Sequence, residues 1–352
     1  MRQLTIDGRI INDDSDAYVI CEIGHNHCGD LEICKQLFKA AKDCGADAVK
    51  LQKRNNRKLF TKELYNSPYD NPNSYGATYG EHREALEFGW YQYVALKEYA
   101  KQLDLTFFAT AFDIDSANFL AGLEMPAYKI ASWDCQNIPL IRHVTQFKKP
   151  MIISTGGMTM EDIKRALANI PLDVPIAFLH CTSVYHEGGM LPEEANLRAI
   201  PKMMDTFPNI VIGYSDHHSG IALSAVAYIK GARIIEKHFT LNHSWKGTDH
   251  ALSLEPKGMK DLCRDLKRIR IAMGDRTKRK LEREEVVFKK MGNVIHPART
   301  IPKGKRIETD DICIKAPNDG LLPYEYDEVV GKIAINELTT SDCLRKEDLE
   351  NE

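Results

Sequence analysis

The sequence lacks a clear excess of either charge, and it lacks any long apolar run. Its 352 residues include 47 Lys and Arg against 50 Asp and Glu, which gives a formal net charge of −3. Non-specific binding to nucleic acid or to an anionic membrane surface needs a basic excess, so we expect neither partner. No segment approaches the roughly 18 apolar residues of a membrane span. The opening MRQLTIDG also has no apolar run that could act as a signal peptide.

Closely spaced cysteine pairs are also missing. The nine cysteines are scattered, their number is odd, and no C-x-x-C occurs. A disulfide framework or a structural zinc site would need paired cysteines. The segment HNHC places His25, His27 and Cys28 together, but no second Cys/His pair has zinc-site spacing, so we do not expect zinc there. We expect reduced thiols in a cytoplasmic protein.

Short apolar runs alternate with longer amphipathic stretches from Ala17 to about Met273. Strands that alternate with helices pair in parallel, and eight such units predict a closed (β/α)₈ TIM barrel. A doubly wound open sheet stays possible here, because periodicity cannot prove closure. The eight strand-like runs are AYVICEIG from Ala17, DAVKLQ from Asp47, TFFATA from Thr106, AYKIAS from Ala127, PMIISTG from Pro150, IAFLHCTS from Ile176, NIVIGYS from Asn209 and RIIEKHF from Arg233.

The texture changes after Met273. We expect a barrel over residues 1–275, a charged linker over 276–290 and a small β-rich domain over 291–352. The last segment contains a weak internal sequence repeat, called the internal echo below. Either chance or a module with pseudo-twofold symmetry would produce it. Its matching pairs share one offset of 37 residues: Ile301/Leu338, Ile307/Leu344, Asp311/Asp348 and Ile312/Leu349.

The connection after the second strand run is unusually long. It runs from Lys53 to about Gly89 and contains the basic segment KRNNRK, four tyrosines and clusters of Pro and Asn. A connection of this length is uncommon unless it has a function. We expect it on the face of the barrel where the active-site loops gather.

Polar residues end the eight strand runs, although the bodies of the runs are apolar. Reactive residues of a (β/α)₈ barrel lie at these carboxyl ends, and buried Lys, Glu and His need a partner or a ligand. Eight coincident polar ends therefore predict a site. In chain order they carry Glu22, His25, Asn26, His27, Lys50, Gln52, Thr110, Lys129, Ser132, Ser154, Cys181, Thr182, Ser183, Tyr185, Ser215, Asp216, His217, Glu236, Lys237 and His238.

Two pairs within this set indicate chemistry. Lys50 and Lys129, with hydroxyls between them and Gly156 nearby, suit a phosphate or a carboxylate. For either lysine alone, an internal ion pair or an exposed rim position is the alternative. His217 and His238 end neighbouring strands and could converge on a transition metal, with positions left open for a substrate oxygen. Their spacing by itself slightly favours two hydrogen-bonded histidines without a metal.

Seven ordered segments resemble the sialic acid synthase family: CEIGHNHCGD, DAVKLQ, YKIAS, ISTGG, LHCTS, GYSDH and EKHFT, with GTDHALSLEP in addition. The tail, with TIPKGKRIETDDI and VVGKIA, resembles the C-terminal antifreeze-like (SAF) domain of that family. The resemblance spans essentially the whole chain. It implies that phosphoenolpyruvate condenses with an N-acetylmannosamine-like aldehyde, acylated or 6-phosphorylated, and that phosphate leaves by C–O cleavage.

The resemblance also implies roles for individual residues. Phosphoenolpyruvate would be bound by Lys50, Thr110, Lys129, Ser132, Ser154, Ser183 and Ser215. The sugar would face Gln52, Tyr185 and Asp249, while Glu22 and Glu236 would be the catalytic carboxylates that orient water. His217 and His238 would hold a divalent metal, Mn²⁺ first, with Mg²⁺ or Co²⁺ as alternatives. The implied assembly is a domain-swapped homodimer in which the C-terminal domain covers the partner's barrel mouth.

The chain departs from many bacterial members of this family. After LHCTSVY it reads HEGGMLPEEANLR rather than a Pro-Thr-Pro-like turn, and Ala316 stands where those members carry an arginine of the capping domain. YGEHREALEF and SWKGTDHALSLEP are more similar to the animal-type branch, whose acceptor is 6-phosphorylated. The basic segment KRNNRK could serve that phosphate, or it could be a solvated charged loop.

Two other functions remain open at this point. A Schiff-base pyruvate aldolase would form an imine on Lys129 or Lys50 and would need no metal. A non-catalytic carbohydrate-binding protein would use the C-terminal domain as its recognition surface. It would leave the lysines and histidines of the barrel mouth unexplained.

Overall fold

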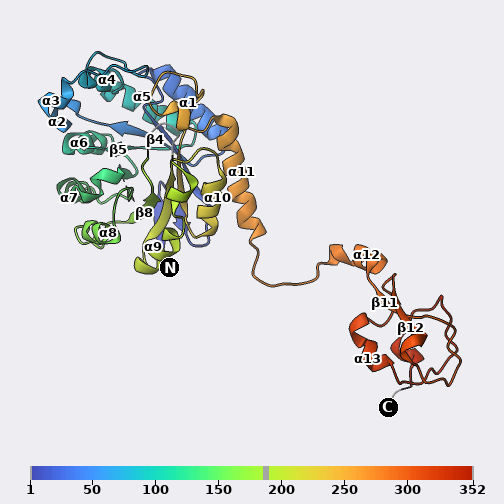
Figure 1. Ribbon diagram of the computed structural model, residues 1–352. Helices are drawn as coiled ribbons and strands as arrows, with labels where there is room; N and C mark the ends of the chain where they lie inside the picture. The colour runs from blue at the N-terminus through green and yellow to red at the C-terminus, as the bar shows by residue number, and fades with distance from the viewer. Residues whose placement is uncertain (1, 185–189, 351–352) are drawn as a thin grey trace. The chain divides into compact units, whose positions relative to one another are not determined.

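The computed structural model describes residues 2–184 and 190–350, and the chain divides into two compact units, Met1–Gly274 and Asp275–Glu352. The first unit is a closed parallel barrel, as predicted (Figure 1). Strand β10 pairs with β3, which closes the sheet and excludes the open doubly wound alternative. The barrel strands are β3 (Tyr18–Gly24), β4 (Ala48–Lys53), β5 (Thr106–Ala111), β6 (Tyr128–Ile130), β7 (Met151–Ser154), β8 (Ile176–Cys181), β9 (Val211–Asp216) and β10 (Ile234–His238).

Side chains alternate between the two faces of each barrel strand, and β4 illustrates the consequence. Val49 and Leu51 belong to the apolar layer between the barrel and its helices. Lys50 and Gln52 point the other way and line the space at the strand ends. Because the side-chain period of a strand is two, a buried lysine next to two apolar residues places its charge inside the barrel.

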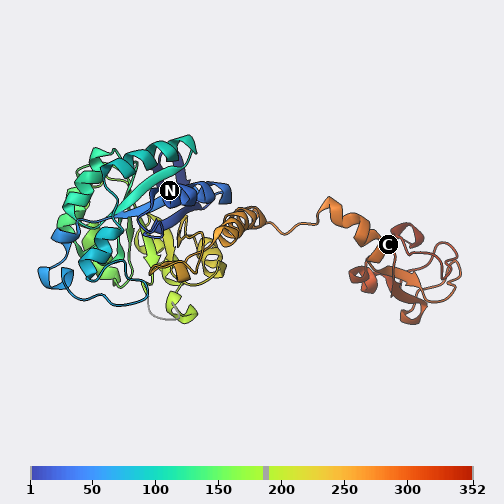
Figure 2. The ribbon, with the colours of Figure 1, turned by 90° about the horizontal axis from the view of Figure 1, so that it is seen from above.

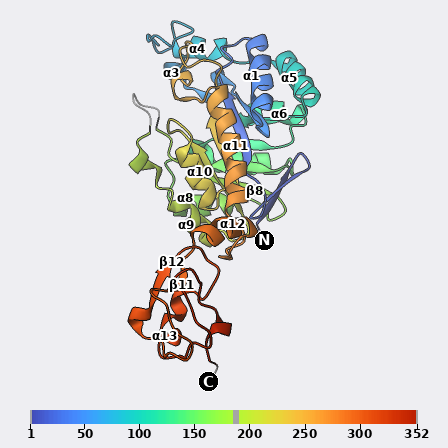
Figure 3. The same ribbon diagram turned by 90° about the vertical axis from the view of Figure 1, so that its right-hand side faces the viewer.

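Helices cover the outside of the strands (Figure 2). Helix α1 begins where Asp30 accepts the backbone N–H groups of Glu32 and Ile33, and it ends at Gly45, whose φ of 87° is left-handed. Helix α11 runs along the outside between α1 and α10 (Figure 3). The outer helices are α1 (Leu31–Cys44), α5 (Trp90–Gln102), α6 (Ile114–Gly122), α7 (Ile138–Thr145), α8 (Met160–Leu167), α9 (Ala199–Thr206), α10 (Ala222–Ile229) and α11 (Pro256–Ala272), with 3₁₀ turns at Ser132–Gln136, Pro192–Ala195 and His250–Leu252.

A hairpin that the sequence analysis missed precedes the barrel. Strands β1 (Gln3–Ile6) and β2 (Arg9–Asn12) pair antiparallel around Asp7 and Gly8, which both have positive φ. The pair Asp-Gly between alternating apolar residues is a strong hairpin signal. Buried side chains of the hairpin pack with the inward-facing residues near the amino ends of the barrel strands: Leu4, Ile6 and Ile11 with Tyr18, Ile20, Ala48, Phe108 and Ile234.

The long connection between β4 and α5 contains α2 (Asn56–Leu59), α3 (Lys62–Tyr65) and α4 (Tyr79–Ala85). Thr78 and Glu81 form a capping box that starts α4. Three contacts join the connection to the loop after β10: Tyr75 Oη donates to the carbonyl of Lys246, Gly247 N donates to Asn73 Oδ1 at 3.1 Å, and Lys246 Nζ lies 4.9 Å from the centre of the Tyr75 ring. The connection therefore lies at the carboxyl end of the barrel, where we expected it.

The second unit is short in strands and rich in turns. It contains α12 (Glu282–Met291), β11 (Val294–Pro297), β12 (Ile312–Lys315) and α13 (Tyr326–Val329), with 3₁₀ turns at Thr309–Asp311, Pro323–Glu325 and Lys346–Asp348. Strands β11 and β12 pair antiparallel. Within residues 2–184 and 190–350, no helix is both long and apolar enough to cross a membrane.

The internal echo of the C-terminal segment corresponds to repeated structure. Ile301 and Leu338, which occupy equivalent positions, exchange two backbone hydrogen bonds of 2.8 and 2.9 Å. Asp311 accepts the N–H of Glu308, and Asp348 accepts the N–H of Arg345, both at 2.9 Å. The apolar members of the echo are all buried together: Ile301, Ile307, Ile312, Leu338, Leu344 and Leu349. This arrangement favours pseudo-twofold symmetry over chance.

Candidate active site

The carboxyl ends of seven of the eight barrel strands, all except β8, contribute residues that line a narrow space of about 40 Å³. The residues expected at a site meet there, and the space also has two aromatic walls, Phe112 and Trp133, that the sequence analysis did not name. Both aromatic residues directly follow strand or site residues, which was the available signal. The expected residues that line the space are Glu22, Lys50, Gln52, Thr110, Lys129, Ser132, Ser154, Ser215, His217, Glu236 and His238.

The two lysines form internal ion pairs in this space. Lys50 Nζ lies 2.5 Å from Glu22 Oε2 and donates to Thr110 Oγ1 at 2.8 Å. Lys129 Nζ donates to Ser154 Oγ at 2.6 Å. Glu236 lies between the lysines, with oxygens 3.8 Å from Lys50 Nζ and 3.7 Å from Lys129 Nζ. The internal ion pair considered for Lys50 is therefore present, and two cations are balanced by two carboxylates.

The two carboxylates have opposite electrostatic environments. Burial raises the pKa of Glu22, and the nearby charge of Lys50 only partly opposes this. Burial would also raise the pKa of Glu236, but Lys129 and Lys50 together hold it below its ordinary value. Carboxylates whose pKa values are pushed apart are typical of acid–base sites.

Serine hydroxyls and one glycine form the wall beside Lys129. Gly156 N donates to Ser132 Oγ at 3.1 Å, and Ser183 Oγ donates to the same oxygen at 3.1 Å. A Cβ on Gly156 would lie 2.2 Å from Ser183 Oγ, so only glycine fits. Ser215 Oγ donates to Glu236 Oε1 at 3.1 Å. The serines of this group that line the space are Ser132, Ser154 and Ser215, and hydroxyl donors beside a lysine suit an anion.

His217 and His238 converge as their strand positions predict. Their ring centroids are 5.3 Å apart with planes at 52°, and Asp249 Oδ2 lies 3.9 Å from His238 Nδ1. Among the described residues, no group of three or more His, Cys, Asp and Glu is arranged to hold a metal. Two imidazoles would leave the other coordination positions of an ion to oxygens of water or substrate. That donor set fits a catalytic divalent ion and does not fit a closed structural one.

A thiol not assigned a role from the sequence lies beside the histidines. Cys181 Sγ is 3.6 Å from His217 Nδ1. Burial alone would raise the pKa of this thiol, but the charge of His217 and the hydrogen bonds with His217, Ser183 and Ser132 together lower it to about 7.

A buried ion pair is formed by the two residues that directly precede His217 and His238 in the sequence. Lys237 Nζ lies 3.0 Å from Asp216 Oδ2, and both side chains are fully buried. Asp216 also accepts from Ser224 Oγ at 2.6 Å, while Lys237 donates to the carbonyl of His218. Because Asp216 precedes His217 and Lys237 precedes His238, this pair fixes the backbone that carries both imidazoles.

The remaining expected residues have different outcomes. Asp249 lies at the edge of the site beside His238, as given above, and Tyr185 lies outside the described residues. The segment HNHC does not form one site. His25 contacts two arginines, His27 stacks on Phe88 at 4.0 Å, and Cys28 Sγ lies 3.4 Å from His250 Nε2.

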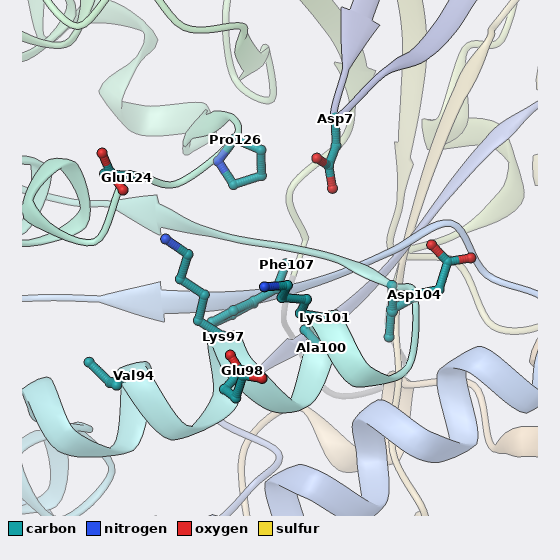
Figure 4. A pocket seen from close by; sticks show the side chains of 11 residues that line it. Asp7, Val94, Lys97, Glu98, Ala100, Lys101, Asp104, Phe107, Glu124 and Pro126 are labelled. Atoms are coloured by element: carbon teal, nitrogen blue, oxygen red, sulfur yellow. The ribbon is translucent and has the colours of Figure 1, made fainter.

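A wider hollow of about 630 Å³ lies at the opposite end of the barrel. It is bordered by the turn of the N-terminal hairpin, by α5 and by the segments that lead into β5 and β6, as Figure 4 shows. Its rim mixes charges of both signs, including Lys97, Glu98, Lys101 and Glu124, and Lys97 donates to the carbonyl of Leu123. Since the amino end of such barrels serves stability and the carboxyl end serves chemistry, we place the active site in the narrower space.

Comparison with known families gives matches over both units. The NeuB family matches residues 37–278, and the SAF domain matches residues 292–350. The chain is 36% identical over 346 residues to N-acetylneuraminate-9-phosphate synthase of Homo sapiens, covering 98% of this chain and 96% of the human protein. It is 33% identical over 340 residues to N,N′-diacetyllegionaminic acid synthase of Legionella pneumophila, covering 95% and 94%.

One similar solved structure is N-acetylneuraminic acid (sialic acid) synthetase from Leptospira borgpetersenii, in complex with citrate. The two structures superpose with a TM-score of 0.71 at 30% sequence identity. The match covers 81% of this chain and 95% of the Leptospira protein.

Proposed function

Because this chain belongs to the NeuB family and carries a SAF domain, we propose that its barrel condenses phosphoenolpyruvate with an N-acetylmannosamine-like aldehyde. Its relatives are sialic and related nonulosonic acid synthases. The protein is therefore an enzyme of the condensing-transferase class. This membership favours the synthase over a Schiff-base aldolase and over a non-catalytic carbohydrate-binding protein.

The observation that carries the proposal is the convergence of two lysines and two histidines on one narrow space. An anionic substrate fits the lysine side, and an aldehyde oxygen fits the histidine side. We assign the phosphate and carboxylate of phosphoenolpyruvate to the lysine side, where they would compete with Glu22 and Glu236 for the ammonium groups. Its binding residues would be Lys50, Thr110, Lys129, Ser132, Ser154, Ser183 and Ser215.

The bond changes follow from this placement. The enol carbon of phosphoenolpyruvate attacks the aldehyde carbon, a carbon–carbon bond forms, and positive charge develops at the carbon that carries the phosphate. Water adds to that carbon, and one of its protons passes through a carboxylate to the former aldehyde oxygen, which becomes a hydroxyl group. The hydroxyl group that water leaves on the carbon then gives its proton to the departing phosphate, the C–O bond to phosphate breaks, and the keto acid forms. We propose that Glu22 and Glu236 orient the water and accept its proton.

The acceptor sugar is assigned to the side of Gln52, Tyr185 and Asp249. Gln52 Nε2 donates to Glu22 Oε1 at 2.6 Å, so a sugar hydroxyl bound by Gln52 would lie next to the catalytic carboxylate. Asp249 borders His238 and would accept from a second hydroxyl. These contacts would keep the aldehyde end of the sugar near the enol carbon.

The two histidines would hold a divalent metal. We propose Mn²⁺, with Mg²⁺ or Co²⁺ as alternatives, because imidazole donors combined with oxygen donors suit these ions. When bound, the ion would act as a Lewis acid toward the aldehyde oxygen of the sugar. The Asp216–Lys237 pair would keep the imidazoles in place for it.

We further propose a homodimer in which the C-terminal unit of one copy covers the barrel mouth of the other. The exposed apolar side chains of α12 support a protein–protein contact: Val286, Val287, Phe288 and Met291. Removal of the residues after about 290 should then abolish activity while the barrel stays folded. We also propose a cytoplasmic location, which the nine free cysteines support.

The proposed function is tested by phosphate release from phosphoenolpyruvate in the presence of Mn²⁺. The acceptors should include N-acetylmannosamine, its 6-phosphate, mannose 6-phosphate and a 2,4-diacetamido-trideoxyhexose. Release that requires one of these sugars and stops with EDTA supports the synthase. Inactivation by borohydride in the presence of substrate, with no effect of EDTA, would instead identify a Schiff-base aldolase.

A further inference from the structure

Trp133 is a large exposed side chain within an otherwise buried turn. It belongs to the 3₁₀ turn Ser132–Gln136, and 55% of its surface is exposed, whereas Asp134 and Cys135 in the same turn are buried. A single exposed apolar residue is ordinary on a protein surface. Trp133 differs because it also lines the narrow space at the strand ends, together with Phe112. The site therefore has an aromatic wall, Phe112 and Trp133, to which the proposed function assigns no role.

The ring of Trp133 is held by a stack of planar groups. It stacks on Phe112, with ring centroids 6.0 Å apart and planes at 30°. The guanidinium carbon of Arg54 lies 3.7 Å from the centre of the Phe112 ring, and Arg54 Nη2 donates to Gln52 Oε1 at 2.6 Å. Phe112 itself is buried. Trp133 is therefore the open member of the stack, and its packing against Phe112 limits how far its ring can turn.

The aromatic wall follows the strands that carry residues assigned to phosphoenolpyruvate. Phe112 comes two residues after Thr110 of β5, and Trp133 directly follows Ser132, which comes after β6. Of the described residues assigned to the sugar, Gln52 lies on β4 and the other follows β10. This placement puts the aromatic wall beside phosphoenolpyruvate rather than beside the sugar.

The aromatic wall also stands across the barrel from a carboxylate proposed to orient water. The eight strands form a closed ring in the order β10, β3, β4, β5, β6, β7, β8 and β9, so β6 lies opposite β10. Glu236 lies on β10, and Trp133 follows β6. Phosphoenolpyruvate bound by Lys129 and Ser132 would thus have a polar wall on one side, where one water is oriented, and an apolar wall on the other.

Phosphoenolpyruvate can react with water alone, and this side reaction explains why one side should stay dry. A proton from water adds to the methylene carbon, and the remaining hydroxide adds to the carbon that carries the phosphate. That hydroxyl group then gives its proton to the departing phosphate, the C–O bond to phosphate breaks, and pyruvate forms. In the condensation, the aldehyde carbon takes the place of the first proton. Exclusion of bulk water from the methylene carbon therefore favours condensation over hydrolysis.

We propose that the aromatic wall covers the methylene carbon of bound phosphoenolpyruvate and excludes bulk water, so that phosphate is released only when a sugar aldehyde reacts. This proposal rests on the proposed function and adds to it the residues that couple phosphate release to carbon–carbon bond formation. An indole ring suits this role because it offers a large apolar surface with few rotatable bonds.

The first test measures pyruvate formation by the full-length protein with phosphoenolpyruvate and Mn²⁺. Lactate dehydrogenase and NADH detect pyruvate, both without a sugar and with the sugar that supports phosphate release. We expect Trp133→Ala to form pyruvate about tenfold faster than the wild type or more, because bulk water reaches the methylene carbon. The matched control is Trp90→Phe, since Trp90 lies on α5, packs against Phe119 and is 45% exposed. A contaminating phosphatase would act equally in every preparation.

Steady-state kinetics locate the contact. We expect Trp133→Ala to raise the KM for phosphoenolpyruvate by about two- to tenfold, the effect of one aromatic contact, and to change the KM for the sugar by less than about twofold. Trp133→Phe should restore most of the coupling, because a phenyl ring can still stack on Phe112. Rescue by this variant distinguishes the aromatic wall from a merely structural role of the turn.

Intrinsic fluorescence tests the contact without turnover. The chain has three tryptophans, Trp90, Trp133 and Trp245. Phosphoenolpyruvate alone should change the fluorescence of the wild type and of Trp90→Phe, and it should leave that of Trp133→Phe unchanged. If this pattern appears but no sugar supports phosphate release, the synthase reaction is refuted and the contact with phosphoenolpyruvate stands. A full fluorescence change in Trp133→Phe would refute the contact.

Three further outcomes overturn the proposal for Trp133. Pyruvate formation that stays at the wild-type rate in Trp133→Ala refutes the exclusion of water. A raised KM for the sugar alone assigns the aromatic wall to the acceptor, and a loss of dimer with unchanged pyruvate formation assigns it to the partner's C-terminal unit. Circular dichroism checks that Trp133→Ala is folded. If it is not, the fluorescence of Trp133→Phe still decides whether the ring contacts phosphoenolpyruvate.

Discussion

The two ends of the barrel are formed by the same eight strands but contain opposite kinds of residue. At the carboxyl end, two buried lysines and two buried glutamates are linked by three ion pairs of 2.5 to 3.8 Å. At the amino end, the apolar side chains of the N-terminal hairpin, Leu4, Ile6 and Ile11, close the barrel against other apolar residues.

This difference places the residues proposed for catalysis at one end of the barrel and a cluster of stabilising apolar residues at the other. Buried charges are tolerated when each has a partner, and they then stand ready to exchange that partner for an anionic substrate. Apolar burial at the other end contributes stability in proportion to the area removed from water and offers no reactive group. Substitutions at the carboxyl end should therefore damage catalysis first, whereas substitutions at the amino end should damage stability alone.

The largest effect is expected at the histidine pair. His238→Ala should lower kcat by about 10³-fold or more, because the variant loses one of two imidazoles proposed to hold the metal. His143→Ala is the control, because His143 lies on α7 and bonds to Asn118 outside the site. Phosphate release with added Mn²⁺ measures both variants. Normal turnover by His238→Ala in the presence of a chelator would show that no metal bound by this residue takes part in the reaction.

Lys129→Ala should have the next largest effect and should show up in two measurements. Loss of one charge-assisted contact should lower kcat/KM for phosphoenolpyruvate by about 10- to 100-fold. Glu236 would lose a buried partner, so the free energy of unfolding should fall by about 3 kcal/mol. Lys101→Ala, at the rim of the hollow near the amino end, should change neither quantity. Unchanged phosphoenolpyruvate kinetics in Lys129→Ala would contradict the assignment.

Ile6→Ala tests the amino end of the barrel. Ile6 is fully buried in the hairpin contact, so its truncation should lower the free energy of unfolding by about 2–5 kcal/mol. The value of kcat/KM should stay within about twofold at temperatures where the variant is folded. Urea unfolding and phosphate release together make the comparison, with the exposed neighbour Ile10→Ala as the control. A large loss of kcat in Ile6→Ala without a loss of stability would contradict the assignment of stability to the amino end and catalysis to the carboxyl end.

The smallest effect concerns pH and the C-terminal unit. Burial would raise the pKa of Asp311, but its bonds to Lys305, to the N–H of Glu308 and to Arg299 lower it from 3.8 to about 2. The folded pKa is thus below the unfolded one. The stabilisation is fully present above about pH 4 and is lost as pH falls toward 2.

Hydrogen exchange of the amides of Ile301 and Leu338 measures this stability in the full chain. Between pH 4 and 2, the free energy of opening should decrease in the wild type. In Asp311→Asn it should be lower at pH 4 and should vary less over the same range. Equal pH dependence in the two proteins would show that Asp311 does not cause it.

Strand and helix positions in the barrel were predictable from local pattern. All eight expected strand runs overlap a barrel strand, because strands covered by helices have short apolar sequences between amphipathic stretches. The N-terminal hairpin was missed although Asp7-Gly8 is a hairpin signal. Its strands have only four residues each, and their apolar side chains become buried only when the hairpin packs against the barrel.

The site was predictable as a set of residue types at strand ends. Which of its charged residues form ion pairs was not predictable. Lys50 and Glu22 lie on adjacent strands, and nothing in their sequence spacing requires an ion pair of 2.5 Å. The thiol of Cys181 and the wall of Phe112 and Trp133 were also not assigned a role, because a cysteine or an aromatic residue near a strand end is usually part of the core.

The sequence by itself determined the number and order of the barrel strands, the end of the barrel where polar residues gather, and the echo in the C-terminal segment. These depend on side-chain periodicity and on short-range pattern. Only the tertiary structure decided which charges neutralise each other. Within KRNNRK it paired Lys53, Arg57 and Lys58 with carboxylates and left Arg54 beside His25. Electrostatic partnership depends on distances in space, and these partners, 27 to 57 positions apart in the chain, meet only when the chain folds.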